Sequence, residues 1–249
     1  MTALGFLYPG HSAEDDYPRI EQLLGSDIRV DLVHTELGAD AHRVDALDVA
    51  ALRELGSPER FAAGCEALRL TGAEAVVWAS AGGSFVHGHT GARNQIRALA
   101  QAAGMPASSS AFAFVHAARE IGADRVAVAS TYPEEVALLF ADFLGEAGVP
   151  VTAVRSAPPP TASTDLATWG TDDILTLARA ADTPEAEAIL LPDTALHTAA
   201  HIPTLEKELS KPVLTASQVT VWEALRLTDR RVNAPTLGAL FTREPLVQV

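Results

Sequence analysis

Short apolar runs alternate along the chain with longer stretches in which apolar residues recur every three or four positions. The short runs are typical of buried β-strands, and the longer stretches are typical of amphipathic helices. We predict strands at Ala3–Tyr8, Arg29–His34, Ala75–Ala79, Arg125–Ser130, Val151–Arg155 and Ala188–Leu191, with a shorter one near Pro212–Leu214. We predict helices at Pro58–Thr71, Gly91–Ala103, Ala111–Ile121, Glu134–Ala147, Thr171–Ala181, Ile202–Leu209 and Val219–Arg226. Such alternation favours an α/β fold with parallel sheets.

Three pairs of segments indicate that this pattern occurs twice. The matched segments are Glu74–Phe85 with Glu187–Thr198, Met105–Ser110 with Lys211–Ser217, and Gly5–Ser12 with Ala127–Pro133. Each member of the first pair is an apolar run that ends in small and polar residues. The duplication predicts two pseudo-symmetric α/β lobes, each a parallel sheet flanked by helices. The expected limits are residues 1–115 plus 217–249 for the first lobe and 116–216 for the second.

The duplication also predicts where a ligand binds. Ligands of open α/β sheets bind beyond the carboxyl ends of the strands. Ser80 and Asp193 follow equivalent apolar runs, so we expect them on opposite walls of a cleft between the lobes. Four loops would line this cleft, at residues 9–12, 80–84, 130–133 and 192–198.

Composition narrows the choice of partners. The 249 residues carry a formal net charge of −14, which repels nucleic acid and anionic membranes, so neither is expected as a partner. A small anion remains possible, because salt screens the overall charge beyond about 8 Å. The chain shows no signal peptide and no run of about 20 apolar residues, which favours a cytoplasmic protein. Helices rich in Ala and Leu make a homodimer possible.

Motifs for cofactors and metals are missing from the sequence. There is no Walker loop, dinucleotide-binding glycine pattern or Cys-x-x-Cys pair, so no cofactor is expected. His87 and His89 lack a nearby third ligand, so no metal is expected. We expect Cys65, the single cysteine, to pack inside a helix, and Pro158–Ser163 to form a stiff surface connection. No element is predicted from Asn233 onward.

Small residues after the first apolar run indicate an anion-binding loop. The loop consists of Ser80, Ala81, Gly82, Gly83 and Ser84. Backbone N–H groups at a strand end and helix start attract anions, and small side chains let a carboxylate come close. Thr194 and Ala195 would offer the same on the other lobe.

The order and spacing of these segments resemble the maleate isomerase and arylmalonate decarboxylase group of the aspartate/glutamate racemase superfamily. The resemblance covers most of the chain, from the opening strand and its Pro loop through Ile189–Asp193 and Leu205–Val213. It implies two lobes with a cofactor-free site between them, where proton transfer or isomerisation occurs next to a carboxylate. In the racemases and isomerases each duplicated loop carries a cysteine. The decarboxylase has only the second cysteine, which protonates a carbanion.

Both cysteine positions of the family carry other residues here, Ser80 and Asp193. A thiol has a reference pKa of about 8.5, whereas an Asp starts near about 3.9 and a Ser hydroxyl needs an adjacent base. A two-thiol racemase mechanism is therefore excluded, and nucleophilic addition to a double bond is disfavoured. Asp193 could act as an acid or base if burial and a substrate carboxylate raise its pKa. Alternatively, Asp193 caps the helix that follows it.

The resemblance also assigns residues that bind the substrate. Tyr132 resembles the family's tyrosine that donates to a substrate carboxylate, and Ser12 resembles the position of a carboxylate-binding asparagine. His11 and His197 lie on the predicted cleft loops, where either could pair with Asp193 or attract a dicarboxylate. Solvated or capping roles remain open for these side chains.

Several functions stay open at this point. The leading prediction is a cofactor-independent lyase or isomerase acting next to a carboxylate of a small organic acid, by decarboxylation or proton transfer with Asp193 as acid or base. The alternatives are a maleate-type cis-trans isomerase, a hydrolase or hydratase that uses Asp193 as base, and a non-catalytic protein that binds a small diacid.

Overall fold

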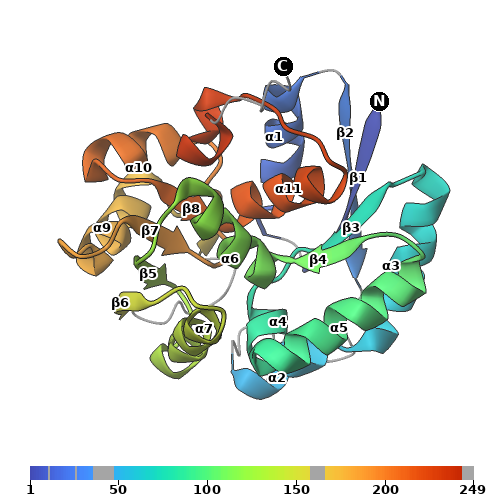
Figure 1. The fold of residues 1–249 in the computed structure, drawn as a ribbon, viewed down its shortest axis with the longest axis horizontal. Coiled ribbons are helices and arrows are strands. Elements are labelled where there is room, and N and C mark those ends of the chain that lie inside the picture. Colours follow the sequence, from blue (N-terminus) through green and yellow to red (C-terminus); the bar gives the residue numbers. More distant parts are fainter. Residues whose placement is uncertain (11, 26, 36–47, 158–165, 243–249) are drawn as a thin grey trace.

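The computed structural model describes residues 1–249 except 11, 26, 36–47, 158–165 and 243–249. Its strands form two four-stranded parallel sheets (Figure 1). The first sheet has the order β2 (Ile28–Thr35), β1 (Thr2–Pro9), β3 (Ala75–Trp78), β4 (Ala107–Ser109). The second has the order β6 (Val151–Ser156), β5 (Val126–Ser130), β7 (Ala188–Leu191), β8 (Val213–Thr215).

The two sheets share one topology. In each, the strand that comes second in the chain lies at an edge, followed by the first, third and fourth. The predicted two-lobed α/β fold is thereby confirmed. The first and third strands occupy the middle of each sheet, so the loops after β1, β3, β5 and β7 start from the two sheet centres. The exact residue limits of the lobes stay a prediction.

Helices cover the sheets and join them. Their bounds are α1 Asp16–Leu24, α2 Val49–Leu55, α3 Pro58–Thr71, α4 Gly82–Phe85, α5 Gly88–Ala103, α6 Ser110–Ile121, α7 Glu134–Glu146, α9 Thr171–Ala181, α10 Ile202–Leu209 and α11 Ala216–Leu227. Two short 3-10 helices follow, η2 (Pro235–Leu237) and η3 (Ala239–Phe241). The α6–α11 pair lies between the sheets, and both helices contact β4 and β8 (Figure 1).

The largest apolar cluster runs through both lobes. It includes Phe6 of β1 and Val77 of β3, Val128 of β5, and Phe114 of α6 and Val221 of α11, all fully buried. Burying apolar surface is the main favourable contribution to folding, so this shared cluster also fixes one lobe against the other. Cys65 is buried in a smaller cluster, as its packing role predicts.

Six of the described elements were not predicted from the pattern, namely α1, α2, β4, α4 and the two 3-10 helices η2 and η3. They are short, and β4 consists of Ala107 and two serines. Except in α1, their apolar periodicity is therefore weak, and contacts with neighbouring elements stabilise them. The Pro158–Ser163 prediction lies outside the described residues. Within the described part of the chain, no helix is both long and apolar enough to cross a membrane.

Candidate active site

Asp193 is a buried carboxylic acid just beyond the end of β7. Only 3% of the surface of Asp193 is exposed to solvent. The Thr131 hydroxyl donates to Oδ2, and the Ala195 backbone N–H donates to Oδ1 at 2.8 Å. Burial raises the pKa of Asp193 above its ordinary value, although these two hydrogen bonds act in the opposite direction. The carboxyl group therefore keeps its proton to higher pH than an exposed Asp would.

The capping alternative for Asp193 is wrong for the helix that follows. The next helix, α10, has His201 as its N-cap residue, eight positions further along. The Asp193 carboxylate instead accepts the N–H two residues ahead, within a turn. Ala195 thus contributes its N–H to Asp193.

Tyr132 of the second lobe meets the glycine loop of the first. A Cβ added to Gly82 would lie 3.2 Å from the Tyr132 hydroxyl oxygen. Burial raises the pKa of Tyr132 well above its usual range, the charge of Asp193 raises it further, and the Gly82 backbone partly opposes both. Tyr132 therefore stays protonated and can donate a hydrogen bond. The rings of Phe85 and Tyr132 make an edge contact, with centroids 5.7 Å apart.

The loop that starts at Ser80 is a compact turn. The Gly83 N–H donates to Ser80 Oγ at 3.1 Å, and the Ser84 N–H donates to the Ala81 carbonyl at 3.0 Å. The Ser84 hydroxyl donates to Gln95 Oε1 at 2.6 Å, while Gln95 Nε2 donates to the Gly83 carbonyl at 2.7 Å. Gln95 of α5 therefore fixes the position of this loop through two hydrogen bonds.

Tyr8 is a site residue that the sequence prediction did not name. It is buried near the end of β1, where its hydroxyl donates to the Thr194 carbonyl at 2.8 Å and accepts the Ala13 N–H at 3.1 Å. Its hydroxyl also bonds to Ser12 Oγ, at 3.1 Å. Burial raises the pKa of Tyr8 to about 12, so it stays a neutral donor. The available signal was its place at a strand end equivalent to that of Tyr132.

Asp16 is a second residue that sequence reasoning missed. It is 2% exposed and accepts the N–H groups of Thr198 and Ala199, at 2.8 and 3.0 Å. The Ser217 hydroxyl of α11 donates to the same oxygen at 2.9 Å. An acid at the start of a helix normally suggests capping. No local signal indicated that this one reaches a loop 182 residues away.

The two histidines on predicted cleft loops differ in what the structure describes. His197 Nε2 bonds to Asp15 Oδ1 at 2.5 Å, and its Nδ1 bonds to the Ala167 carbonyl at 3.2 Å. The hydrogen bonds of His197 therefore go to Asp15 and Ala167 and not to Asp193. His11 lies outside the described residues. No group of three or more His, Cys, Asp and Glu side chains suited to a metal occurs among the residues with described positions.

The geometry brings most of the predicted site together. Tyr132 interacts with both duplicated loops, because its hydroxyl lies against Gly82 and the charge of Asp193 raises its pKa. Tyr8 ties Ser12 to Thr194 across the lobes. The result is a buried acid, two neutral phenols, of which Tyr8 already donates to Thr194, and a small-residue loop. Such a set can hold a carboxylate and move a proton.

Comparison with known proteins identifies relatives of this chain. Over 150 residues the chain is 32% identical to the arylmalonate decarboxylase of Bordetella bronchiseptica, and the match spans 58% of this chain and 61% of that protein. A mutant arylmalonate decarboxylase in a sulfate-associated form superimposes with a TM-score of 0.79 at 26% identity, covering 98% of this chain and 100% of the other.

A second class of solved structures shares the fold. A mutant maleate isomerase from Pseudomonas putida, solved with maleate, superimposes with a TM-score of 0.85 at 18% identity, covering 97% of each chain. The sequence profile of the arylmalonate decarboxylase family matches residues 50–241. That span includes Ser80, Tyr132 and Asp193. Because this profile matches well over half of its residues, the chain belongs to the arylmalonate decarboxylase family.

Proposed function

We propose that this protein is a cofactor-independent decarboxylase of a small malonate-type diacid, with Asp193 as the proton donor. The observation that carries the proposal is the buried Asp193 carboxyl group, whose pKa is raised and whose charge acts on Tyr132. Family membership and the resemblance to arylmalonate decarboxylase support it. A cytoplasmic location and a homodimer remain expectations from the sequence.

The binding step follows from the neutral donors. Tyr132 would donate to the substrate carboxylate that stays, with the Gly82 backbone hydrogen-bonded to its hydroxyl oxygen and the Ala81 N–H as a further donor. Donors already in place at a developing negative charge stabilise the transition state strongly, because they need no reorganisation during the reaction. Phe85 packs against Tyr132 and adds an apolar wall. An apolar surrounding favours the loss of a carboxylate as neutral CO₂.

The chemical step needs one proton. The bond between the α-carbon and the departing carboxylate breaks, and its electron pair enters the remaining carboxylate as an enediolate. CO₂ leaves, and protonated Asp193 transfers its proton to the α-carbon. Water then restores the proton on Asp193. This sequence requires a carboxyl group that is protonated at working pH, which is what the raised pKa of Asp193 favours.

Assays of Asp193→Asn against a set of substituted malonates test the proposal. General acid catalysis contributes about 10² to 10⁴ in rate, so we expect a loss of kcat in that range. Asn mimics the neutral acid, and the variant should fold. The matched control is Asp142→Asn, which changes an exposed acid on α7 and should keep full activity. Full activity of Asp193→Asn would refute the proposed role.

The pH profile and isotopes separate the alternatives. Because Asp193 donates only while protonated, kcat should be constant at low pH and fall as pH rises through the raised pKa. In D₂O the product should carry one deuterium at the α-carbon. Incorporation of labelled water oxygen would instead indicate a hydrolase or hydratase, and conversion of maleate to fumarate would indicate the isomerase. Binding of a diacid without turnover would indicate a non-catalytic protein.

A further inference from the structure

Four arginines surround a surface pocket that contains none of the candidate active-site residues. The pocket has a volume of about 480 Å³ and is lined by parts of α5, β4, α6, α7 and α11. Its arginines are Arg93 and Arg97 of α5, Arg119 of α6 and Arg226 of α11. Small-molecule sites usually have volumes of about 300 to 1,000 Å³, so its size suits a small ligand.

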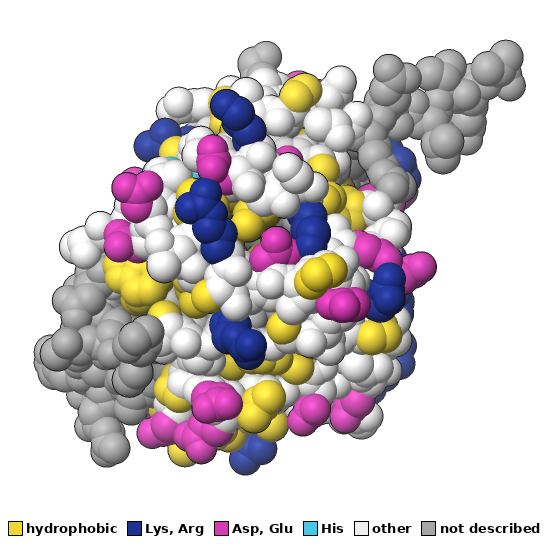
Figure 2. All heavy atoms as spheres, turned by 90° about the vertical axis from the view of Figure 1, so that its left-hand side faces the viewer, with side chains coloured by type: hydrophobic (Ala, Val, Ile, Leu, Met, Phe, Trp, Pro, Cys, Tyr) yellow, Lys and Arg dark blue, Asp and Glu magenta, His cyan; other side chains and the backbone are white. Residues whose placement is uncertain are grey.

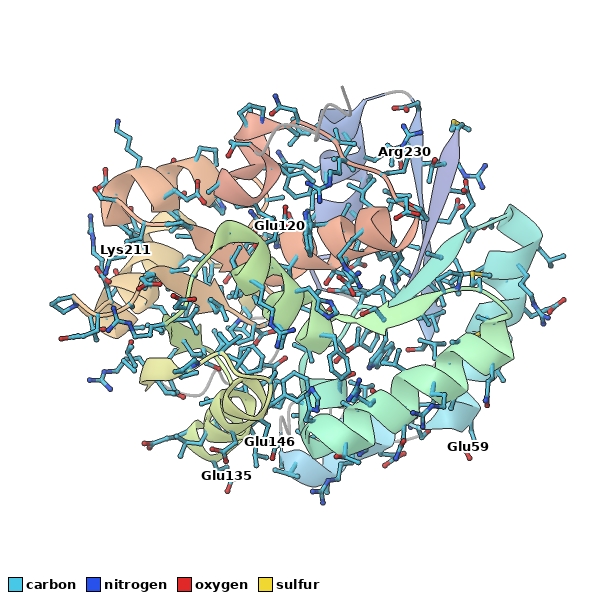
Figure 3. All side chains as sticks on the ribbon, viewed as in Figure 1. Glu59, Glu120, Glu135, Glu146, Lys211 and Arg230 are labelled. Carbon is cyan, nitrogen blue, oxygen red and sulfur yellow. The ribbon has the colours of Figure 1, made fainter. Side chains whose placement is uncertain are left out.

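The charge of this pocket is opposite to that of the whole protein. The chain has 32 acidic and 18 basic residues, yet the pocket lining has four guanidinium groups and one carboxylate, Glu146. Glu146 is labelled in Figure 3, near the end of α7. Arg93 and Arg97 are exposed, and among the described residues no carboxylate lies within ion-pair distance of either.

Another face of the molecule shows the usual arrangement. On the face turned to the viewer in Figure 2, which includes the side of α9 and α10, acidic and basic side chains are interspersed. Arg179 of α9 pairs with Glu208 of α10 at 2.8 Å, and Lys211 pairs with Asp182 at 2.6 Å. Arg179 and Lys211 thus have acidic partners from this chain, whereas Arg93 and Arg97 leave their charge available to a ligand.

The inner wall of the pocket is already ordered by hydrogen bonds. Arg226 donates to the fully buried Glu223 from Nε at 2.8 Å and from Nη2 at 2.9 Å. His116 Nδ1 bonds to the same carboxylate at 3.0 Å. Arg119 donates to the Ala147 carbonyl. These bonds hold Arg119 and Arg226 in place, so the inner wall of the pocket is formed before any ligand binds.

An aromatic ring lines the pocket beside the arginines. Phe112 is half-buried and lies nearly parallel to His116, with ring centroids 6.3 Å apart and an interplanar angle of 23°. Its ring also contacts His89, at 5.4 Å, and Phe143, at 5.3 Å. Offset-stacked rings attract one another, so the flat part of a ligand can add to this cluster.

We propose that this pocket binds a small multivalent organic anion, with its phosphate or clustered carboxylate groups on Arg93 and Arg97 and its flat apolar part on Phe112. The planar guanidinium fork matches carboxylate and phosphate oxygens in bidentate geometry. The pocket is concave, which favours a small molecule over the surface of another protein. This binding does not depend on the decarboxylase proposal, because none of its residues belongs to that site.

Calorimetric titration with two probes at low ionic strength tests this pocket. ATP carries clustered phosphates, and a benzenetricarboxylate carries clustered carboxylates; both have a flat ring. We expect saturable binding of one probe per chain for at least one of them. Arg93→Gln combined with Arg97→Gln should weaken it about a hundredfold, since each lost hydrogen bond between charged groups costs about a factor of ten in affinity. Arg179→Gln combined with Arg125→Gln removes the same charge elsewhere and should leave affinity unchanged.

A second variant and a second measurement complete the test. Phe112→Leu should weaken binding of the ring-bearing probe but leave inorganic triphosphate unaffected. Binding of ATP alone assigns phosphate ligands, and binding of the tricarboxylate alone assigns carboxylate ligands. The proposal is overturned if neither probe saturates, or if the arginine double variant binds as tightly as the wild type. Sedimentation that shows loss of self-association in that variant would also overturn it, by assigning these arginines to a contact between copies.

Discussion

The loops after β3 and β7 occupy equivalent positions in the two lobes but are held in different ways. Gln95 of the same lobe makes the hydrogen bonds that hold the loop at residues 80–84, and Tyr132 of the other lobe contacts it at Gly82. The loop at residues 192–199 is bound within its own lobe by Thr131, but Tyr8 and Asp16 of the other lobe supply most of its hydrogen bonds. Equal topology thus produced two kinds of support, and the position of the candidate acid depends on contact between the lobes.

The two loops also differ in whether their key side chain can exchange a proton near neutral pH. Ser80 has a hydroxyl that accepts a hydrogen bond and does not titrate near neutral pH. Asp193 titrates, and burial shifts its pKa upward. Burial of a titratable group requires neighbours that exclude water, and here one of these neighbours, Tyr8, comes from the opposite lobe. The comparison predicts that damage to the lobe contact affects the Asp193 loop first.

The largest effect is expected from Asp16→Ala. The change leaves two buried backbone N–H groups and the Ser217 hydroxyl without their acceptor. Each unpaired buried group costs about 1 to 3 kcal/mol, so the free energy of unfolding should fall by about 3 kcal/mol. Urea denaturation measures it. The neighbouring Asp15→Ala removes an exposed ion pair with His197 and should cost under about 1 kcal/mol. Equal losses in the two variants would contradict the cross-lobe role of Asp16.

Gly56→Ala tests the support of the first loop. A Cβ at this position would lie 2.2 Å from the Gly83 carbonyl oxygen and 2.4 Å from Gln95 Nε2. Because backbone must move, the expected loss is about 2 kcal/mol, together with lower affinity for a carboxylate ligand. Gly145→Ala is the matched control, since nothing lies within 4 Å of its Cβ, and a helical Gly-to-Ala change in α7 should stabilise by about 0.5 to 1 kcal/mol. Unchanged ligand affinity in Gly56→Ala would show that the loop does not need this packing.

Tyr8→Phe should have the smallest effect. It removes the hydroxyl that bonds to the Thr194 carbonyl, the Ala13 N–H and Ser12 Oγ. It keeps the ring, whose centroid lies 5.8 Å from that of Tyr17. We expect a loss of about 1 kcal/mol in stability and a several-fold loss in kcat, because the Asp193 loop is less well held. Ser12→Ala removes only one partner of the same hydroxyl and should cost less. A larger effect from Ser12 than from Tyr8 would place the important contact elsewhere.

Sequence reasoning succeeded for elements whose apolar pattern is long or strongly repeated. The central strands β1, β3, β5 and β7 are short apolar runs bounded by polar or small residues, and their duplication indicated two lobes with Ser80 and Asp193 in equivalent places. It failed for β4, which spans three residues, and it overlooked α1, whose buried Tyr17, Ile20 and Leu24 do recur at helical spacing. Missing α1 also meant missing Asp16, which lies at its first position.

The sequence by itself determined the alternation of strands and helices, the duplication and the loops that carry the candidate chemistry. These properties follow from local periodicity and from small residues at strand ends. Only the tertiary structure decided that Thr131 and Ala195 bind Asp193, and that Asp16 and Tyr8 hold its loop from the other lobe. Hydrogen-bond partners that are far apart in the chain depend on how the lobes pack, and no local pattern encodes that packing.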